Sequence, residues 1–469
     1  MSEVSANIAQ LLEASARRRP DKTVLLQEGE EIDFKTLERR AGGFAGMLAG
    51  RGIGRGDRIA IQIHNRLSFV TALWGGLKAG VAVAPLNERL LTEELDKIVA
   101  DLDPALVVKE VDQSEDDFQP VETAIEDPAI ILYTSGSTGA AKGVLLSHGA
   151  TGFALESWKT PVMNLSVDDI VLSALPLAHS LGIFGSVMAP LLAGACVVFL
   201  PRFTPEDAVE IIARRKITIF PGVAPLFRRI VDSPAGKGAD FSSLKYALSG
   251  AAPCPWELFR EWQALTGTRI IRGYGMTEMF RPISFSPTDD HEVPDSIGRA
   301  MPSVQLRVVD DDGHDVATGE SGELIINSPA RFTGYLNRPD ETAQVLDGDW
   351  FKTADIATIS TDGYVRIVGR KKEMILRGGY TVSAGEIEAM LATHPKISEA
   401  AVIGVPDRDL GEDIAAFVTL RPGMELTPDE IVEFCKERMA SYKYPRRVRI
   451  QDELPKGPTG KVAKLELKL

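Results

Sequence analysis

The sequence contains only three cysteines among its 469 residues, and their positions exclude several kinds of site. Cys196, Cys254 and Cys435 are widely separated, so no C-x-x-C pair is available for a metal or a redox centre. The six histidines show no metal-ligand spacing either. We therefore expect no His/Cys metal site, and a reducing, cytoplasmic setting is the simplest interpretation.

An export signal and an excess of positive charge are also missing from the sequence. The first twenty residues, MSEVSANIAQLLEASARRRP, place polar and acidic residues where a signal peptide needs an apolar core, so we expect no export. The net charge of −14 argues against nonspecific binding to nucleic acid, which needs a basic face. A small anionic ligand is not excluded, because it needs only a local positive patch.

Long apolar runs are scarce, and one of them has the length of a membrane span. Residues 181–200, LGIFGSVMAPLLAGACVVFL, carry no charge. Pro190, Gly194 and the terminal CVVFL favour a buried helix that turns into a buried strand, so we expect no integral membrane association. The overall composition, 44% hydrophobic and 25% charged, is that of an ordinary globular protein. At this length two or more domains are expected.

The pattern of apolar residues predicts an α/β protein. Strand-like runs (RIAIQI, VAVAPL, ALVVKE, CVVFLP and ITIFPG) alternate with amphipathic stretches, as in proteins with largely parallel sheets. Thr204 and Thr427 each precede a proline and acidic residues, which predicts two helix starts. Cys435 shares a helical face with Ile431 and Phe434, so it is expected in the core. After about residue 300, short strands broken by Asp-Gly and Ser-Gly turns predict a small antiparallel sheet or barrel.

Residues 133–148, YTSGSTGAAKGVLLSH, concentrate glycines and hydroxyls before one lysine. Glycines let backbone N–H groups approach an anion, hydroxyls add donors and Lys142 adds positive charge, so the segment predicts a phosphate-binding loop. It is not a Walker loop, because Ala141 and Gly143 stand where that motif has glycine and Ser/Thr. The apolar runs on both sides argue against a plain surface linker.

Five further motifs follow this loop, in a fixed order. They are PLAHSLG at 176–182, YGMTE at 274–278, WFKTAD at 350–355, VGRKKEMI at 368–375 and LPKGPTGK at 454–461. With the loop, they make nearly the whole chain resemble the adenylate-forming superfamily, which includes acyl- and aryl-CoA synthetases, luciferases and the adenylation domains of peptide synthetases. The chain is most like fatty- or aryl-acyl-CoA synthetases.

The resemblance implies a fold and a division into domains. A large N-terminal domain, residues 1–371, would comprise two α/β subdomains and a small β-barrel, and would bind ATP and the acid. Residues 372–469 would form a small, mobile α+β domain that rotates about Lys372 between half-reactions. Only about 25 residues separate the PALVV strand from the glycine loop, fewer than relatives usually carry.

The implied reaction is the ATP-dependent conversion of a carboxylic acid to acyl-AMP, with release of pyrophosphate. Tyr274 would lie against adenine, Thr277 would meet the α-phosphate, and Glu278 would be a Mg²⁺ ligand. Asp355 would accept hydrogen bonds from the ribose, with Arg370 beside it, although on its own Asp355 reads as a solvated turn residue. Ala354 stands where most relatives have glycine. The implied nucleotide-binding residues are Thr134, Ser135, Gly136, Ser137, Thr138, Gly139, Lys142, Ser249, Gly250, Ala251, Tyr274, Gly275, Thr277, Asp355 and Arg370.

The resemblance assigns catalysis of adenylation to Lys461 together with Thr277 and Glu278. Lys461 would bridge the carboxylate and the nucleotide and stabilise the charge that develops. In the second half-reaction the acyl group would pass to coenzyme A, whose pantetheine tunnel would be lined by Gly378, Gly379 and Tyr380. The close alternative is an acyl-AMP ligase that loads an acyl carrier protein. A catalytically silent relative is disfavoured because Lys461 and Glu278 are both present.

The acid itself is predicted from the pocket positions that the resemblance implies: His179, Val223, Ser249, Gly250, Ala251 and Met279. Most are small or apolar, which favours a monocarboxylic fatty, alicyclic or aromatic acid. Malonyl-CoA synthetases carry an arginine directly before the tyrosine of YGMTE, where this chain has Gly273. The aspartate with which amino-acid-activating domains hold an ammonium group is missing after PLAHSLG. Arg281 could pair a distal acid, but we expect a surface or ATP-side position for it.

Overall fold

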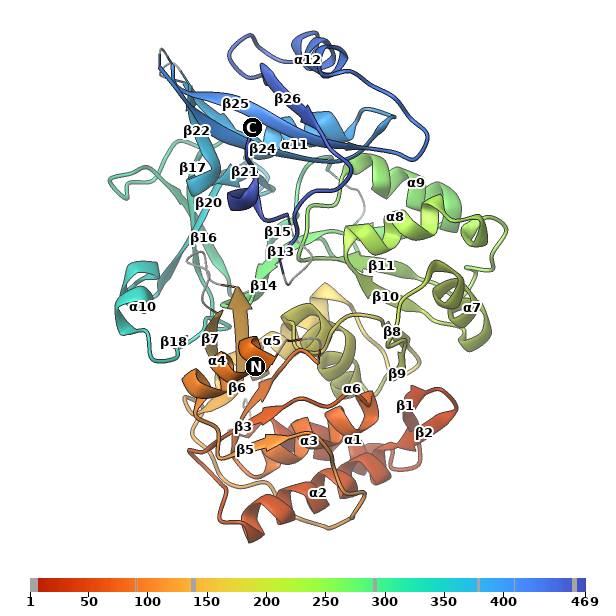
Figure 1. Cartoon of the computed structure of the whole chain (residues 1–469). Coiled ribbons are helices and arrows are strands. Elements are labelled where there is room, and N and C mark those ends of the chain that lie inside the picture. The colour runs from red at the N-terminus through yellow and green to blue at the C-terminus, as the bar shows by residue number, and fades with distance from the viewer. Residues whose placement is uncertain are drawn as a thin grey trace. The chain divides into compact units, whose positions relative to one another are not determined.

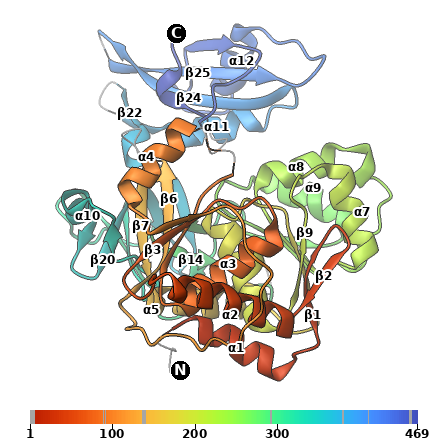
Figure 2. The same ribbon diagram turned by 60° about the horizontal axis from the view of Figure 1, so that its bottom comes forward.

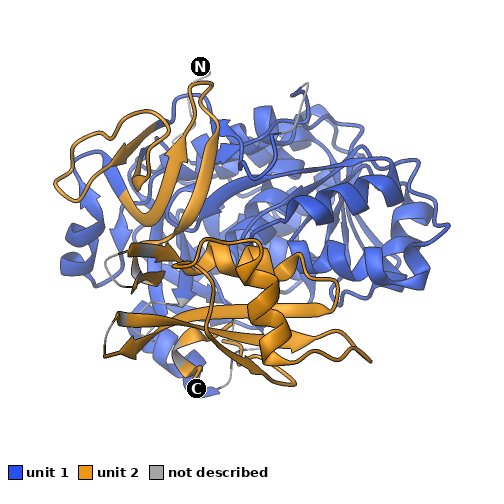
Figure 3. Cartoon of the chain, turned by 90° about the horizontal axis from the view of Figure 1, so that it is seen from above, with its two compact units in different colours: residues 1–305, 326–351 blue, residues 306–325, 352–469 orange. Residues whose placement is uncertain are grey.

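The computed structural model of the chain describes residues 7–88, 90, 92–135, 141–289, 293–377, 380–408, 410–457 and 462–469. The chain divides into two compact units, shown in blue and orange in Figure 3. Unit 1 consists of residues 1–305 and 326–351, and unit 2 of residues 306–325 and 352–469. The predicted hinge and domain boundary at Lys372 stay a prediction.

Unit 1 contains a seven-stranded sheet that is parallel except for the β1–β2 pair at its edge, as far as the described residues show. The predicted strands CVVFLP and ITIFPG are confirmed as its β9 and β10. In spatial order the strands are β12 (Arg269–Ile271), β11 (Tyr246–Ser249), β10 (Ile219–Gly222), β8 (Ile170–Ser173), β9 (Cys196–Phe199), β1 (Thr23–Gln27) and β2 (Glu30–Asp33).

Three amphipathic helices, α7 (Pro205–Arg215), α8 (Ala224–Asp232) and α9 (Trp256–Thr266), pack against this sheet and run beside β10 and β11 in Figure 1. Their shared core contains Phe220 of β10, Phe227 of α8 and Trp262 of α9. Phe227 meets the other two rings edge-on, with centroids 5.4 and 5.1 Å away. The predicted start of α7 is confirmed, because the Thr204 side chain accepts a hydrogen bond from the backbone N–H of Asp207.

The other large sheet of unit 1 changes direction at the glycine loop. The four strands of this sheet that precede the loop in the chain are parallel to one another. The strand that follows the loop, β7, runs antiparallel to β6 and to β18. Residues 136–140 therefore join two antiparallel neighbours. In spatial order the strands are β18 (Gly334–Tyr335), β7 (Ala141–Ser147), β6 (Pro128–Ser135), β4 (Ala82–Pro85), β3 (Arg58–Ile61) and β5 (Leu106–Val108).

Helices α1 (Ala9–Arg18), α2 (Phe34–Gly50) and α3 (Arg66–Lys78) lie together beside these strands, as Figure 2 shows. A buried charge cluster ties the three helices: Lys78 of α3 lies 3.3 Å from the Glu13 carboxylate of α1 and also pairs with Glu38 of α2. Helices α4 (Thr92–Leu102) and α5 (His148–Ser157) complete this part of the unit.

The short segment between β5 and β6 lies across the surface of α2. A Cβ added to Gly42 would come within 2.1 Å of the Asp116 carbonyl oxygen, and one added to Gly43 within 2.1 Å of that of Ser114. The amide of Val121 also donates to the carbonyl of Lys78 at 2.7 Å. Glycine at 42 and 43 thus allows a direct path from β5 to the glycine loop.

The apolar run at 181–200 forms buried helix and strand, as predicted. It comprises a π-helix (Leu181–Met188), α6 (Ala189–Ala193) and strand β9, and Gly194 ends α6 in the left-handed region with φ 79°. None of the helices in the described ranges is long and apolar enough to cross a membrane.

A three-stranded antiparallel sheet completes unit 1. It consists of β13 (Gly273–Met276), β14 (Phe280–Ser284) and β15 (Arg299–Ala300). The residues of the YGMTE motif thus occupy β13 and the tight turn that leads into β14. Helix α10 (Pro339–Val345) follows β18 further along the chain.

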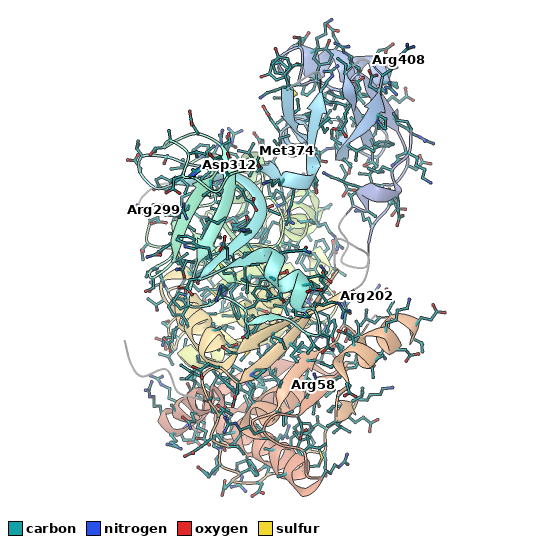
Figure 4. All side chains as sticks on the ribbon, turned by 90° about the vertical axis from the view of Figure 1, so that its left-hand side faces the viewer. Arg58, Arg202, Arg299, Asp312, Met374 and Arg408 are labelled. Atoms are coloured by element: carbon teal, nitrogen blue, oxygen red, sulfur yellow. The ribbon has the colours of Figure 1, made fainter. Side chains whose placement is uncertain are left out.

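Between residues 305 and 370 the strands pair as the turns predicted, with β20 and β21 antiparallel. The strands are β16 (Gln305–Val309), β17 (Gly322–Asn327), β19 (Leu346–Asp347), β20 (Trp350–Ile359) and β21 (Val365–Arg370). A 3₁₀ turn, Lys371–Glu373, leads from β21 to Met374, which Figure 4 labels at the start of β22.

The remainder of unit 2 is an α+β fold around its own core. Cys435 is fully buried there beside Ile431, as predicted, and burial raises the pKa of its thiol to about 11. The predicted helix start at Thr427 is a complete capping box with Glu430. The elements are β22 (Met374–Arg377), β23 (Tyr380–Ser383), α11 (Ala384–Ala392), β24 (Ile397–Asp407), β25 (Gly411–Leu420), α12 (Pro428–Lys436) and β26 (Arg447–Ile450).

Ala354, the alanine of the TAD motif, adopts a backbone conformation that favours glycine. Its φ of 56° lies in the left-handed region, where a Cβ is crowded by the backbone. Neighbouring hydrogen bonds hold it there: the Thr353 hydroxyl donates to the carbonyl of Leu324 at 2.7 Å and accepts from the Asp355 amide at 3.0 Å. The departure from the usual glycine therefore places strain next to Asp355.

We predict that Ala354→Gly stabilises the protein, raising the free energy of unfolding by about 1 kcal/mol because the left-handed strain is removed. Chemical denaturation followed by circular dichroism measures this change. The matched control is Ala357→Gly on the same strand, where the alanine is fully buried and has no positive φ. That variant should lose about 1 kcal/mol, and equal destabilisation by both substitutions would contradict the assignment of strain.

Candidate active site

The predicted residues Ser249, Gly250 and Ala251 lie where β11 ends. Carboxyl ends of parallel strands are the usual place for ligand sites in α/β proteins. Ser249 and Gly250 are buried, whereas Ala251 is exposed and has a φ of 61°. The chain therefore turns sharply out of the sheet at this point. Val223 occupies the corresponding place after β10, as the N-cap of α8.

The YGMTE motif forms a tight hairpin between β13 and β14. Gly275 is required there, because a Cβ at this position would lie 2.0 Å from the carbonyl oxygen of Phe280. Phe280 itself has a φ of 58°, which closes the turn. Tyr274, Thr277 and Glu278 are half-buried, and Met279 is fully buried.

Glu278 and Lys142, which were predicted from two separate motifs, both contact Tyr335. The Tyr335 hydroxyl donates to Glu278 Oε1 at 2.8 Å, and Lys142 Nζ lies 5.3 Å from the centre of the same ring. The backbone reinforces this geometry, since the Phe332 amide donates to the Glu278 carbonyl at 2.8 Å. Burial and the nearby Glu278 raise the pKa of Tyr335, so the phenol keeps its proton and remains a donor.

Lys142 also has a carboxylate partner, Glu341 of α10, and is itself largely buried. Thr134 lies opposite Lys142 in the β6–β7 ladder, so the two ends of the glycine loop are fixed at this point. Tyr335 and Glu341 were not among the residues predicted from the sequence. The only signal was the segment FTGYLNRPDE, which reads as an ordinary turn between two short elements.

Arg281 lies in the interior, so the predicted surface position is wrong. Its side chain on β14 is 5% exposed, and the guanidinium bonds to three neutral acceptors. Nε donates to Ser284 Oγ at 2.9 Å, Nη1 to the Ser249 carbonyl at 2.8 Å and Nη2 to the Ile271 carbonyl at 3.2 Å. It also shares a small cavity with Met279 and Trp158. The ends of β11, β12 and β14 are thereby tied together.

His179 belongs to the segment that leads into the π-helix. Its carbonyl accepts a hydrogen bond from the Ile183 amide at 2.9 Å, and its side chain is half-buried. Leu181, two residues on, lies beside Gly250, since a Cβ on Gly250 would be 3.3 Å from a Leu181 methyl. The PLAHSLG and β11 segments of the predicted acyl pocket are therefore neighbours.

In unit 2, Asp355 and Arg370 form an ion pair across β20 and β21. They are register partners, and Arg370 Nε lies 2.7 Å from Asp355 Oδ1. Asp355 is 3% exposed and lies within a strand, so the reading as a solvated turn residue is wrong. Next to this pair, Lys371 bonds to Asp311 and Glu323 at 2.9 and 3.0 Å.

Several predicted residues lie outside the described residues: Gly136, Ser137, Thr138, Gly139, Gly378, Gly379 and Lys461. Lys456 and Val462, which flank the last of these, form an antiparallel bridge. The Lys372 backbone belongs to the 3₁₀ turn before β22. Tyr380 begins β23, is 55% exposed and stacks on Tyr442 with ring centroids 4.4 Å apart.

The predicted metal ligand Glu278 is a hard oxygen donor that suits Mg²⁺. Its Oε1 accepts from Tyr335, which fixes the orientation of the carboxylate while its second oxygen can still bind a cation. Among the described residues, the one cluster of three potential ligands is exposed: Asp310, Asp312 (labelled in Figure 4) and His314. The amides of Asp312 and His314 donate to Asp310 Oδ1, so a turn accounts for that cluster.

The chain is similar to known proteins over almost its whole length. The AMP-binding enzyme family matches residues 12–336, and the AMP-binding enzyme C-terminal domain matches residues 386–461. A long-chain-fatty-acid–CoA ligase from Yersinia pestis is 32% identical over 99% of this chain and 94% of its own length. The predicted fold, a large N-terminal and a small C-terminal domain, is confirmed.

Two solved structures are similar over almost the whole chain. ATP-bound MatB from Rhodopseudomonas palustris has a TM-score of 0.91 and 30% identity, covering 97% of each chain. The anthranilate CoA ligase AuaEII in complex with anthranoyl-AMP has a TM-score of 0.92 and 27% identity, covering 99% of this chain and 96% of the other. The chain therefore belongs to the AMP-binding enzyme family of the adenylate-forming superfamily, and it is an AMP-forming acid–thiol ligase of the acyl-CoA synthetase kind.

Proposed function

We propose that the protein joins a carboxylic acid with a largely apolar body to coenzyme A, through an acyl-AMP made from ATP. The observation that supports this most directly is the meeting of Glu278 and Lys142 around Tyr335. A carboxylate and a lysine held against the same tyrosine suit a ligand that combines a metal-bound phosphate with further negative charge. The Asp355–Arg370 pair supplies the acceptor for ribose hydroxyls.

In the first half-reaction, a carboxylate oxygen of the acid attacks the α-phosphorus of ATP. The bond from that phosphorus to the bridging oxygen breaks, and pyrophosphate leaves. Lys142 balances charge on the departing pyrophosphate, and Thr277 donates to the α-phosphate. Glu278, oriented by Tyr335, would hold Mg²⁺, which supplies electrostatic stabilisation of the phosphates when bound.

In the second half-reaction, the thiol sulfur of coenzyme A attacks the acyl carbon, the bond to AMP breaks and the thiol proton is lost to solvent. The exposed Tyr380, stacked on Tyr442, supports a role in lining the path of the pantetheine arm. The alternative acceptor is an acyl carrier protein, which presents the same pantetheine thiol. A cytoplasmic location, which the three free cysteines favour, belongs to this proposal.

The first prediction separates the two half-reactions. Lys461→Ala should lower acyl-AMP formation by about 100- to 1000-fold, because a cation that stabilises the developing charge is lost. Thioester formation from supplied acyl-AMP should stay close to that of the wild type. Pyrophosphate release and thioester formation are measured separately.

The control for this prediction is Lys456→Ala, at a lysine that is 41% exposed and pairs with Glu399. It should leave both half-reactions unchanged. Equal loss of both half-reactions in Lys461→Ala would contradict the role given to Lys461.

The second prediction concerns the hinge. Lys372→Pro fixes φ and should hinder rotation, so pyrophosphate release should persist while thioester formation falls by about 100-fold through misplacement of the C-terminal residues. Lys372→Ala, which leaves φ free, is the matched control and should support both steps. If the proline variant performs both steps at wild-type rates, the pivot lies elsewhere.

The third prediction concerns the acid and its acceptor. Fully buried Met279 and the small residues Gly250 and Ala251 favour an apolar body, at about 0.8 kcal/mol for each buried methylene. Pyrophosphate release should therefore increase with chain length along a series of aliphatic acids. It should also be faster with cyclohexane- or benzoate-type acids than with amino acids. Turnover should depend on coenzyme A. Preference for an amino acid would refute the pocket argument, and indifference to coenzyme A would favour a carrier protein.

A further inference from the structure

Arg281 is a buried cation with no carboxylate beside it in the part of the chain that the structure describes. Its side chain is 5% exposed, and all its partners among the described residues are neutral: one hydroxyl, two carbonyls and the face of Trp158 at 5.7 Å. Burial lowers the pKa of Arg281 to about 9, so the guanidinium still carries its charge at neutral pH. Charges in protein interiors are normally paired, because an unpaired charge loses its hydration without compensation.

The guanidinium also has hydrogen-bonding capacity left over. An arginine presents five N–H groups, and Arg281 uses one on each of its three nitrogens among the described residues. One N–H on Nη1 and one on Nη2 therefore remain for a further acceptor. These two terminal nitrogens are the ones that bind a carboxylate in an end-on bidentate arrangement.

A second unused polar group lies next to it. The Ser249 hydroxyl is buried and has no hydrogen-bond partner among the described residues, while the carbonyl of the same residue accepts from Arg281 Nη1. Ser249 and Arg281 thus present a donor and a cation at the end of β11. Buried hydroxyls without partners are rare, so one beside a guanidinium with two unused N–H groups points to a missing ligand.

This place belongs to the predicted acyl pocket. A Cβ on Gly250 would lie 3.2 Å from Arg281 Nη1, and the neighbouring Leu181 methyl is equally close. Glycine at 273 makes the arrangement possible, because a Cβ there would come within 2.4 Å of the guanidinium.

The competing explanation is a purely structural role for Arg281, because its hydrogen bonds to backbone carbonyls hold strand ends together. Arg269 on β12 shows what such a role looks like. It donates to the carbonyls of Ser286, Pro287 and Asp289, yet it is only half-buried, so water can solvate its charge. A structural role does not explain why Arg281 is buried beside a hydroxyl that has no described partner.

We infer that Arg281 and the Ser249 hydroxyl form a subsite for a second carboxylate, carried on the apolar body of the acid away from the reacting carboxylate. This inference rests on the proposed function and refines its substrate class to dicarboxylic acids with an apolar spacer. The two free N–H groups of Arg281 bind the two oxygens of the second carboxylate, and the Ser249 hydroxyl donates to one of them. The reacting carboxylate stays at the nucleotide.

The test compares acids that differ only in the second charge. Dicarboxylic acids of increasing length, including aromatic ones, are each paired with their monomethyl ester, and kcat/KM is measured by pyrophosphate release with the full chain. At the matching length the wild type should prefer the dicarboxylic acid by at least about 100-fold, since buried polar groups reject an analogue that leaves them unpaired. Arg281→Met should abolish this preference, so that the ratio of kcat/KM for the dicarboxylic acid to that for its monomethyl ester falls to about one.

Two further variants distinguish a loss of the subsite from a disruption of the surrounding structure. Arg269→Met removes an arginine that also bonds to carbonyls but lies outside the subsite, so the preference for the dicarboxylic acid should not change. Ser249→Ala removes a hydroxyl without a described partner, so it should fold normally and reduce the preference by about 10-fold. It keeps the test decisive if Arg281→Met does not fold.

The outcomes are distinguishable. If monocarboxylic acids and esters are activated while no dicarboxylic acid of any length is preferred, the subsite is refuted and the proposed function stands. An unchanged preference in both Arg281→Met and Ser249→Ala also refutes it. If no acid releases pyrophosphate, the proposed function itself fails, and the subsite with it.

Discussion

The hydrogen bond from Tyr335 to Glu278 is the interaction around which the rest of the site is arranged. It joins β18 to the turn after β13, two segments almost sixty residues apart in the chain. The same aromatic ring faces Lys142 at the end of the glycine loop. Because the phenol is buried and stays protonated, it donates permanently and fixes the carboxylate in one orientation. In the proposed mechanism, a preorganised carboxylate and lysine lose little entropy on meeting a polyphosphate, which is what electrostatic catalysis requires.

The sheets supply the rigidity that this interaction needs. β18 pairs with β7, and β7 with β6, so Tyr335, Lys142 and Thr134 are held by one continuous ladder. The hairpin of β13 and β14 is held separately, by a glycine turn and by the carbonyl bonds of Arg281. The candidate site residues thus lie on strand ends and tight turns, where the sheets hold them in place.

Much of this arrangement could be predicted from the sequence, because it rests on local signals. The α/β alternation, the helix starts at Thr204 and Thr427 and the buried run at 181–200 all follow from periodicity and capping rules. The motifs predicted Glu278, Lys142 and Asp355 as site residues. Tyr335 and Glu341 could not be found in this way, because their roles arise from strand pairing between distant segments. Asp355 alone read as a turn residue, whereas in the fold it is a buried carboxylate that pairs with the exposed Arg370 across the ladder.

Arg281 shows why burial can reverse an interpretation. In a sequence, an arginine after a turn reads as a surface residue, because charged side chains seldom lie in cores. In the fold it is enclosed by β11, β12 and β14 and bound only to neutral groups, so the conformation of the cation is already fixed before any ligand arrives. Apolar walls with one fixed charge distinguish substrates better than apolar walls alone, since a methylene changes binding by little whereas an unpaired buried charge changes it by orders of magnitude. Specificity in this enzyme would then depend on one ion pair set in an otherwise permissive pocket.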